Sequence, residues 1–334
     1  MMLLLFFFLL FLRQSPAEHC HPDDIAAILK FKNSFSNPQL LPSWTLDMDC
    51  CYIFDCDESN RIVDLTITYS DLSGTIPDAV ADLTHLQTLR LKKMPFLAGE
   101  IPPAIGKMTQ LVTLQISWTN ISGHVPRFLA NLQNLKIFDL SFNKLSGSIP
   151  PSLATFPDII GLDLSRNQLT GPIPESFGHF PGKLPSISLS RNRLSGKIPA
   201  SLANVNFFRV DISRNNLSGD ASMFFGDSKS SDSIDISRNN FEFNFSQVRF
   251  MAPLVTLDIS HNKIYGNIPS QITDAVVLQV LNVSYNRLCG EIPTGWKLSL
   301  LRQLTMVKLK PILTKWMFPN PNTALWLSQD LRIG

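Results

Sequence analysis

The sequence predicts an α/β solenoid with a parallel sheet on its concave face and a disulfide cap at its N-terminal end. Residues 138–150 read Phe-Asp-Leu-Ser-Phe-Asn-Lys-Leu-Ser-Gly-Ser-Ile-Pro, and copies recur at steps of 23 to 25 residues along most of the chain. Four cysteines precede the first copy. A period of roughly 20 to 29 residues is typical of leucine-rich repeats. We therefore expect about ten such units over residues 63–293, in an elongated rather than globular core.

Residues 1–17 are expected to be a secretory signal. Residues 1–12 are almost entirely Leu and Phe, and a short polar and small-residue segment follows up to Ala17. Such a run is too short to cross a bilayer, which takes about 20 apolar residues. A buried core strand is the alternative interpretation.

Residues 18–62 are expected to cap the solenoid. Their cysteines are Cys20, Cys50, Cys51 and Cys56. In an exported protein such a cluster indicates disulfides, whereas zinc would favour paired C-x-x-C motifs that are missing here. Residues 23–35 have the apolar spacing of a short amphipathic helix with acidic residues in its first turn. With the segment around Trp44, this helix would cover the apolar end of the first repeat.

In each unit the Leu-x-Leu segment predicts a short strand. Its two apolar residues enter the core, and the residue between them points outward. An asparagine follows most strands, as at Asn143 and Asn167. We expect this buried column of amides to satisfy the backbone groups left exposed where each coil turns.

The outward residues of these strands form two columns. Between the paired core residues lie Thr66, Arg90, Gln115, Asp139, Asp163, Ser188, Asp211, Asp235, Asp258 and Asn282. Just before the asparagine position lie Tyr69, Lys93, Trp118, Phe142, Arg166, Arg191, Arg214, Arg238, His261 and Tyr285. An acidic stripe therefore runs beside a basic one, and the aspartate pKa values should be raised unless the arginines compensate.

Fourteen residues of this face are candidates for contact with a partner. They are Lys92, Lys93, Gln115, Trp118, Asp139, Phe142, Asp163, Arg166, Arg191, Asp211, Arg214, Asp235, Arg238 and His261. Exposed aromatic and arginine side chains are the usual anchors of protein interfaces. A self-compensated, solubilising charge ladder is the alternative for the Asp and Arg columns, and a core position is the alternative for Trp118.

Neither catalysis nor nucleic-acid binding is predicted. The net charge is +2 and no nucleic-acid module is present. The six histidines fall into no Ser/His/Asp or Cys/His set on one face. Asp139 and Asp163 should lie about 5 Å apart, near the carboxylate separation of a retaining glycosidase, but that spacing follows from the sheet and nothing closes a sugar cleft around it. No cofactor or metal is expected.

The chain resembles the plant polygalacturonase-inhibiting proteins, a family of extracellular leucine-rich repeat proteins. Four features carry the resemblance: the cysteine cluster with adjacent Cys50 and Cys51, ten units built on the pattern Leu-Ser-Gly-x-Ile-Pro, the replacement of that motif by Gly-Asp-Ala-Ser at 219–222, and the final unit at 281–293. The resemblance covers residues 20–295. It implies pairing of Cys20 with Cys50 and of Cys51 with Cys56.

The resemblance also implies a function. Members are secreted into the cell wall and inhibit fungal or insect polygalacturonases, with pectin or oligogalacturonide as a further ligand. The implied mode is occlusion, in which Asp139, Asp163 and Asp211 oppose the basic residues that hold the polyanionic substrate. The alternative, from a different class, is a receptor-like leucine-rich repeat module for a peptide or wall oligosaccharide.

Four N-x-S sequons predict N-glycosylation of an exported protein. Their asparagines are Asn120, Asn216, Asn244 and Asn282. Asn282 belongs to a predicted concave strand, so a glycan there would block part of that face.

Residues 294–334 depart from the family pattern. A typical member ends in a second disulfide cap, whereas this tail contains no cysteine and carries mainly basic charge. Cys289 is therefore expected to lack its usual partner. We expect the chain as written to be less stable and less active than relatives with that cap, because a solenoid needs both ends covered.

Overall fold

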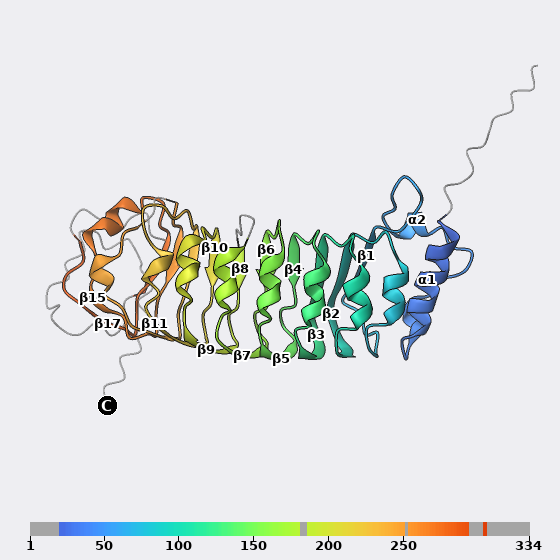
Figure 1. The fold of residues 1–334 in the computed structure, drawn as a ribbon, viewed down its shortest axis with the longest axis horizontal. Helices are drawn as coiled ribbons and strands as arrows, with labels where there is room; N and C mark the ends of the chain where they lie inside the picture. Colours follow the sequence, from blue (N-terminus) through green and yellow to red (C-terminus); the bar gives the residue numbers. More distant parts are fainter. Residues whose placement is uncertain (1–19, 181–185, 251–252, 294–302, 306–334) are drawn as a thin grey trace, which may run out of the picture.

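The computed structural model describes residues 20–180, 186–250, 253–293 and 303–305. The expected signal and most of the expected tail lie outside these residues. The described chain winds into an elongated solenoid with the cap at one end (Figure 1). No helix in the described part is long and apolar enough to cross a membrane.

The N-terminal cap contains the predicted helix, α1 (Pro22–Asn33), and a short second helix, α2 (Cys50–Ile53). The side chain of His21 caps α1 by accepting a hydrogen bond from the Asp23 amide, and Ile28 and Phe31 are fully buried. Trp44 is also buried and packs against Phe31 at a centroid distance of 6.4 Å. The helix and the Trp44 segment thus join the continuous core of the repeats, as predicted for a cap.

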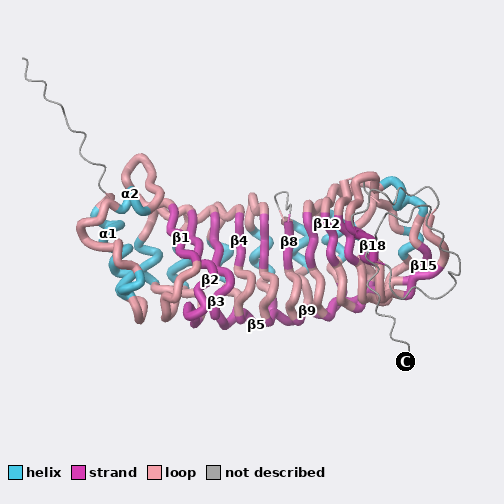
Figure 2. Tube along the Cα trace, turned by 180° about the vertical axis from the view of Figure 1, so that it is seen from behind, coloured by secondary structure: helices cyan, strands magenta, loops and turns pink. Residues whose placement is uncertain are grey.

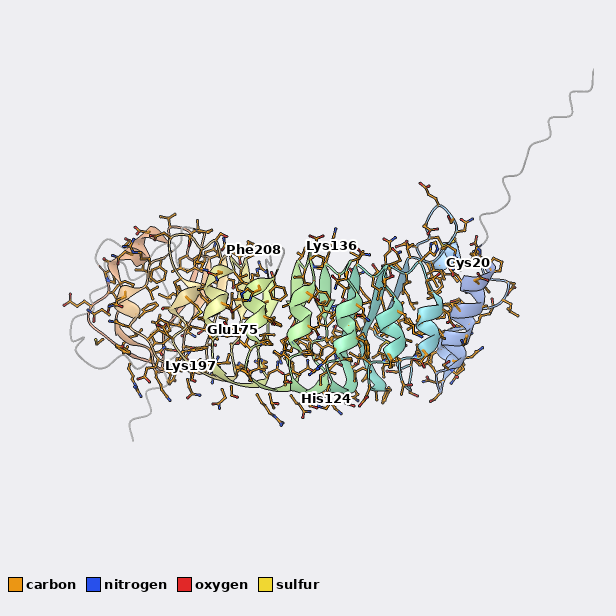
Figure 3. All side chains as sticks on the ribbon, viewed as in Figure 1. Cys20, His124, Lys136, Glu175, Lys197 and Phe208 are labelled. Atoms are coloured by element: carbon orange, nitrogen blue, oxygen red, sulfur yellow. A yellow bond between two sulfur atoms is a disulfide. The ribbon has the colours of Figure 1, made fainter. Side chains whose placement is uncertain are left out.

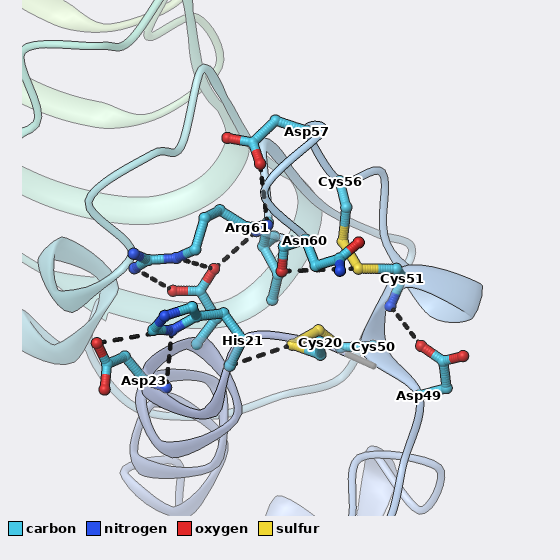
Figure 4. Close-up of a disulfide and its surroundings, with 12 residues drawn as sticks. Cys20, His21, Asp23, Asp49, Cys50, Cys51, Cys56, Asp57, Asn60 and Arg61 are labelled. Atoms are coloured by element: carbon cyan, nitrogen blue, oxygen red, sulfur yellow. Dashed lines mark hydrogen bonds and ion pairs between the residues drawn. A yellow bond between two sulfur atoms is a disulfide. The ribbon is translucent and has the colours of Figure 1, made fainter. Parts of the chain in front are cut away.

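Two disulfides fix the cap, Cys20–Cys50 and Cys51–Cys56, in the pairing that the resemblance implied (Figure 4). The sulfurs of Cys50, Cys51 and Cys56 lie within 4.8 Å of one another, and all three are bonded in these disulfides. The remaining described cysteine, Cys289, is free and exposed.

The predicted parallel sheet, called the first sheet below, has one strand from each of the ten units and an eleventh from the segment expected as tail. Its strands are β1 (Asp64–Thr68), β2 (Thr88–Gly99), β3 (Thr113–His124), β4 (Ile137–Asp139), β6 (Gly161–Asp163), β8 (Ser186–Ser188), β10 (Arg209–Asp211), β12 (Ser233–Asp235), β14 (Thr256–Asp258), β16 (Val280–Asn282) and β18 (Gln303–Thr305). Neighbours pair in parallel, including β18 on β16, and the register of β2 on β3 shifts between Met94 and Ala98. Figure 2 shows these strands on the face opposite the short helices.

A second parallel sheet, which the sequence analysis did not predict, follows the asparagine column. Its strands are β5 (Lys144–Ser148), β7 (Gln168–Gly171), β9 (Arg193–Lys197), β11 (Asn216–Gly219) and β13 (Asn240–Phe241), with a separate pair β15 (Tyr265–Asn267) and β17 (Arg287–Cys289). The long strand β3 pairs with both β4 and β5 and so joins the two sheets. Leu-Ser-Gly forms β5, β9 and β11, and the corresponding residues of the other units form β7, β13, β15 and β17.

Short 3₁₀ helices complete the units on the face opposite the first sheet. They are η2 (Asp78–Asp82), η3 (Pro103–Lys107), η4 (Arg127–Asn131), η5 (Pro151–Thr155), η6 (Glu175–His179), η7 (Ala200–Asn204), η8 (Ser222–Phe224), η9 (Phe245–Gln247) and η10 (Ser270–Asp274), while η1 (Pro38–Leu40) lies in the cap. Most begin directly after the proline of Ile-Pro, which is the N-cap residue and has an extended backbone at the φ that its ring fixes. Unit seven lacks that proline, and η8 is correspondingly only one turn long.

The asparagine column satisfies the backbone as predicted. Asn167 donates from Nδ2 to the carbonyls of Leu140, Leu164 and Ser165 at 2.9, 3.1 and 3.2 Å. Its Oδ1 accepts from the amide of Leu145 in the preceding unit at 3.0 Å. Each such amide therefore ties two neighbouring coils together, and this fixes the spacing of the outward residues on the first sheet.

Candidate functional site

The first outward column forms a continuous row across the first sheet. Register pairs join Asp139 to Asp163, Asp211 to Asp235, and Asp235 to Asp258. Each of these aspartates is half-buried between its neighbours. The row therefore brings carboxylates together from strands that are far apart in the sequence.

These aspartates also have a local structural role. Asp163 Oδ1 accepts a hydrogen bond from the amide of Ser165 at 2.8 Å, and Asp139, Asp211, Asp235 and Asp258 bind the serine two residues on in the same way. This contact explains why Asp-Leu-Ser or Asp-Ile-Ser recurs, whatever else the carboxylates do.

The predicted rise in aspartate pKa is found at two positions. Burial raises the pKa of Asp163, and the neighbouring Asp139 adds to this. Burial raises the pKa of Asp235 to about 6, with Asp211 and Asp258 on either side contributing. Backbone and serine donors oppose both shifts without cancelling them.

The second column has a backbone conformation that the sequence analysis missed. All ten of its residues, from Tyr69 to Tyr285, have φ between 53° and 56°. A positive φ is strongly unfavourable for side chains branched at Cβ, and none of the ten is Val, Ile or Thr. The absence of these residue types from all ten positions was the signal in the sequence for a positive φ. The left-handed turn directs these side chains away from the core, so all ten are exposed or half-buried.

The N-terminal half of this column is a stack of aromatic and cationic groups. Lys93 Nζ lies 4.2 Å from the Tyr69 ring centroid and donates to the Tyr69 hydroxyl at 2.6 Å. Trp118 stacks on Phe142 with centroids 3.5 Å apart, and the Arg166 guanidinium lies 4.4 Å from the Phe142 centroid. Trp118 remains 46% exposed, which excludes the core alternative for this residue.

The C-terminal half of the column is cationic. Arg166, Arg191, Arg214 and Arg238 follow one another, and within the described residues none has a carboxylate oxygen within 4.0 Å of its guanidinium. Burial and the flanking Arg191 and Arg238 lower the pKa of Arg214. His261 ends the row, stacked on Tyr285 at 4.1 Å, and burial together with Arg238 lowers its pKa. The two columns therefore do not compensate each other's charge through direct ion pairs, as the alternative of a self-compensated ladder would require.

A polar groove of about 560 Å³ lies between the two columns. It runs from Asp163 to Asn282 and has serines as its floor. The N-terminal candidates extend this face: Gln115 donates to Asp139 at 2.5 Å, and Lys92 pairs in register with Ser117. All fourteen candidate residues thus lie on one face of the first sheet, in an aromatic part and a charged part.

The sequons lie in different settings. Asn120 lies in the later part of β3 and is half-buried, Asn216 begins β11 and is exposed, and Asn244 caps η9 and is half-buried; none of them belongs to the two outward columns. Asn282 is the last residue of β16, and its Nδ2 donates to Asp258 and Ser260 at 2.9 and 3.2 Å. A glycan replaces one of the two hydrogens on that nitrogen, so it would break at least one of these contacts.

Two known sequence families match this chain, one at the cap and one at the repeats. Residues 21–55 match the leucine rich repeat N-terminal domain. Residues 134–156, 159–180, 183–205, 253–275 and 277–298 match the leucine rich repeat. The prediction of a capped leucine-rich repeat solenoid is therefore confirmed.

Relatives match over most of the chain. The polygalacturonase inhibitor of Pyrus communis is 55% identical over 260 residues, covering 77% of this chain and 79% of its own length. Polygalacturonase inhibitor 1 of Arabidopsis thaliana is 54% identical over 277 residues, covering 81% and 84%. Among solved structures, a plant ice-binding protein superposes with a TM-score of 0.81 at 42% identity, covering 87% of this chain and 97% of its own.

Proposed function

The chain belongs to the polygalacturonase-inhibitor family of plant leucine-rich repeat proteins, and from this premise we propose that it inhibits a microbial, in particular fungal, polygalacturonase by protein–protein binding. Relatives named as inhibitors are 54 and 55% identical over about four-fifths of the chain. The ice-binding relative is less similar, at 42%. The chain acts by binding rather than by catalysis, in keeping with the names of those relatives.

One observation carries the assignment of the binding face: the fourteen candidate residues form a single exposed surface on the first sheet. Aromatic anchors adjoin a row of charged groups that lack ion-pair partners among the described residues. Such a surface combines apolar burial with electrostatic selection of the partner. It is open along its length, which suits a large partner better than a small substrate.

Asp139, Asp163 and Asp211 oppose the basic residues with which the enzyme holds its polyanionic substrate. These carboxylates belong to a rigid sheet and need no rearrangement to bind. The inhibitor therefore occludes the rim of the substrate cleft and presents a pattern of negative charge like that of polygalacturonate.

The arginine row supports a second ligand of the same surface, pectin or oligogalacturonide. Arg191, Arg214 and Arg238 follow one another on consecutive units, and a regular row of cations suits a linear polyanion. We propose the cell wall, outside the cell, as the place of action, with N-glycans on Asn120, Asn216 and Asn244.

The test is release of reducing sugars from polygalacturonate by a panel of fungal enzymes, with and without the purified protein. Heat-inactivated protein is the control. We expect saturable inhibition of at least one enzyme at a protein-to-enzyme ratio near one. Binding to a peptide or wall oligosaccharide with no effect on any hydrolase would instead favour the receptor-like alternative.

A further inference from the structure

A second hollow lies on the first sheet beside the polar groove, at the beginnings of β4, β6, β8 and β10. Its volume is about 330 Å³, and apolar atoms dominate its surface. The first residues of the four strands, Ile137, Gly161, Ser186 and Arg209, form one row in register across it.

The hollow exists because two small residues interrupt this row. Gly161 and Ser186 stand between the larger side chains of Ile137 and Arg209. A Cβ added at Gly161 would meet a single neighbour within 4 Å, Ile137 Cδ1 at 3.8 Å, which is an ordinary contact. Gly161 has no positive φ, so its backbone does not require glycine. The missing side chain therefore leaves usable space.

An exposed apolar side chain lines the hollow, and two more are next in sequence to residues that line it. Ile137 is 38% exposed, and Ile160 and Phe208, which directly precede Gly161 and Arg209, are 48% and 45% exposed. Of the described residues between 119 and 264, these three are the large apolar side chains that remain exposed. Phe208 and Lys136 lie along the same long edge of the solenoid (Figure 3). Apolar surface gathered around a depression is the usual setting of an interface anchor.

The charge around the hollow is negative. Asp139, Asp163 and Asp211 line its inner side, and no described lysine or arginine nitrogen lies within 4.0 Å of their oxygens. Arg209 is already engaged, since its Nε lies 3.2 Å from Asp232 Oδ1. An apolar group that enters would thus lie beside carboxylates that accept hydrogen bonds from serine amides but have no cation partner among the described residues.

We propose that this hollow is an anchor pocket for a bulky apolar side chain that a polygalacturonase loop presents next to a lysine or arginine. The proposal rests on the proposed inhibitor function and adds a specificity determinant to it. The apolar side chain fills the space above Gly161 and contacts Ile137, while the adjacent cation pairs with the carboxylates. Enzymes without such a pair on the contacting loop are then inhibited poorly, because the hollow stays unfilled and the carboxylates stay unpaired.

The decisive variant is Gly161→Val, which fills the hollow from within. Thr256→Val is the matched control, because Thr256 begins β14 in the same row but lies outside the hollow. We expect Gly161→Val to raise the inhibition constant at least tenfold against an enzyme that the wild-type protein inhibits. Thr256→Val should change it less than twofold. Melting temperatures of both variants should stay within a few degrees of the wild type.

A second variant, Ile137→Ser, removes the apolar wall at an exposed position and should also weaken inhibition at least fivefold. If Gly161→Val proves unstable, Ile137→Ser decides the question. If a folded Gly161→Val protein, or the Ile137→Ser protein, inhibits as strongly as the wild type, the anchor-pocket proposal is wrong. The proposed inhibitor function would not be affected by that result. Failure of the wild-type protein to inhibit any enzyme of the panel would overturn both.

Discussion

Trp118 and Phe142 stack face to face with their ring centroids 3.5 Å apart, although both rings lie on the outside of the solenoid. Both residues have left-handed backbones, with φ of 56° and 55°, in adjacent units. The stack is therefore set by the repeat itself, and Arg166 extends it by one unit. A rigid aromatic platform of this kind loses little side-chain entropy when a partner covers it.

Trp118→Ala should therefore weaken inhibition about tenfold or more while leaving the fold intact. Loss of the indole removes a large contact area and frees the Phe142 ring. Tyr265→Ala, in β15 outside the first sheet, is the control and should inhibit like the wild type. Inhibition constants and thermal melts of the three proteins give the answer, and equal inhibition by Trp118→Ala would remove this platform from the interface.

The raised pKa of Asp235 makes stability depend on pH. Its folded-state pKa is about 6, above the usual aspartate value of 3.8, so the folded protein holds this proton more tightly than the unfolded chain. The contribution of Asp235 to the free energy of unfolding is thus fully present below about pH 4 and is lost as the pH rises to about 6. Asp235→Asn should raise the melting temperature at pH 7 and have little effect at pH 4. Asp274→Asn, at the exposed end of η10, is the control; an equal shift at both pH values would contradict this account.

Much of this architecture could be predicted from residue spacing. The ten strands of the first sheet, helix α1, the asparagine contacts and the two outward columns all follow from apolar periodicity and repeat length. These features depend on local alternation of buried and exposed residues, which a single sequence displays directly. The disulfide pairing came instead from family resemblance.

Other features depend on contacts between units that no single repeat displays. The second sheet forms only when the segments after the asparagine column stack from unit to unit, and β18 joins β16 from a segment without the repeat motif. The hollow at Gly161 arises from two small residues in different units meeting on adjacent strands. Positive φ throughout the second column could have been suspected only from the missing β-branched residues.

Asp24 should be essential for the stability of the cap. Its side chain is fully buried and accepts from Arg61 at 2.7 and 3.1 Å and from the Ile62 amide at 2.7 Å. Asp24→Ala leaves the Ile62 amide without its acceptor and a largely buried guanidinium with only the Thr84 hydroxyl at 3.3 Å, so we expect a loss of about 3–5 kcal/mol in the free energy of unfolding. Denaturant titration of the wild type and of Asp24→Ala measures this loss in the free energy of unfolding.

The control for Asp24 is the exposed pair of Lys30 with Asp82, 2.8 Å apart, which also joins the cap to the repeats. Lys30→Ala should lower the free energy of unfolding by less than about 1 kcal/mol, because exposed ion pairs contribute little. Similar losses for the two variants would mean that the Asp24 cluster is not a buried network in solution.

Asn167 should show how strongly neighbouring units depend on one another. Asn167→Ala removes three donated bonds and leaves the Leu145 amide of the preceding unit without its acceptor. Each buried group left unpaired costs about 1–3 kcal/mol, and in a solenoid the effect concentrates on adjacent units. Hydrogen exchange should therefore quicken across β4 to β7 before it does so in β1 or β14. Asn134→Ala, an exposed amide with one bond to the Thr109 carbonyl, is the control and should leave exchange nearly unchanged. Uniform acceleration along the whole chain by Asn167→Ala would instead show that the solenoid unfolds as one cooperative body.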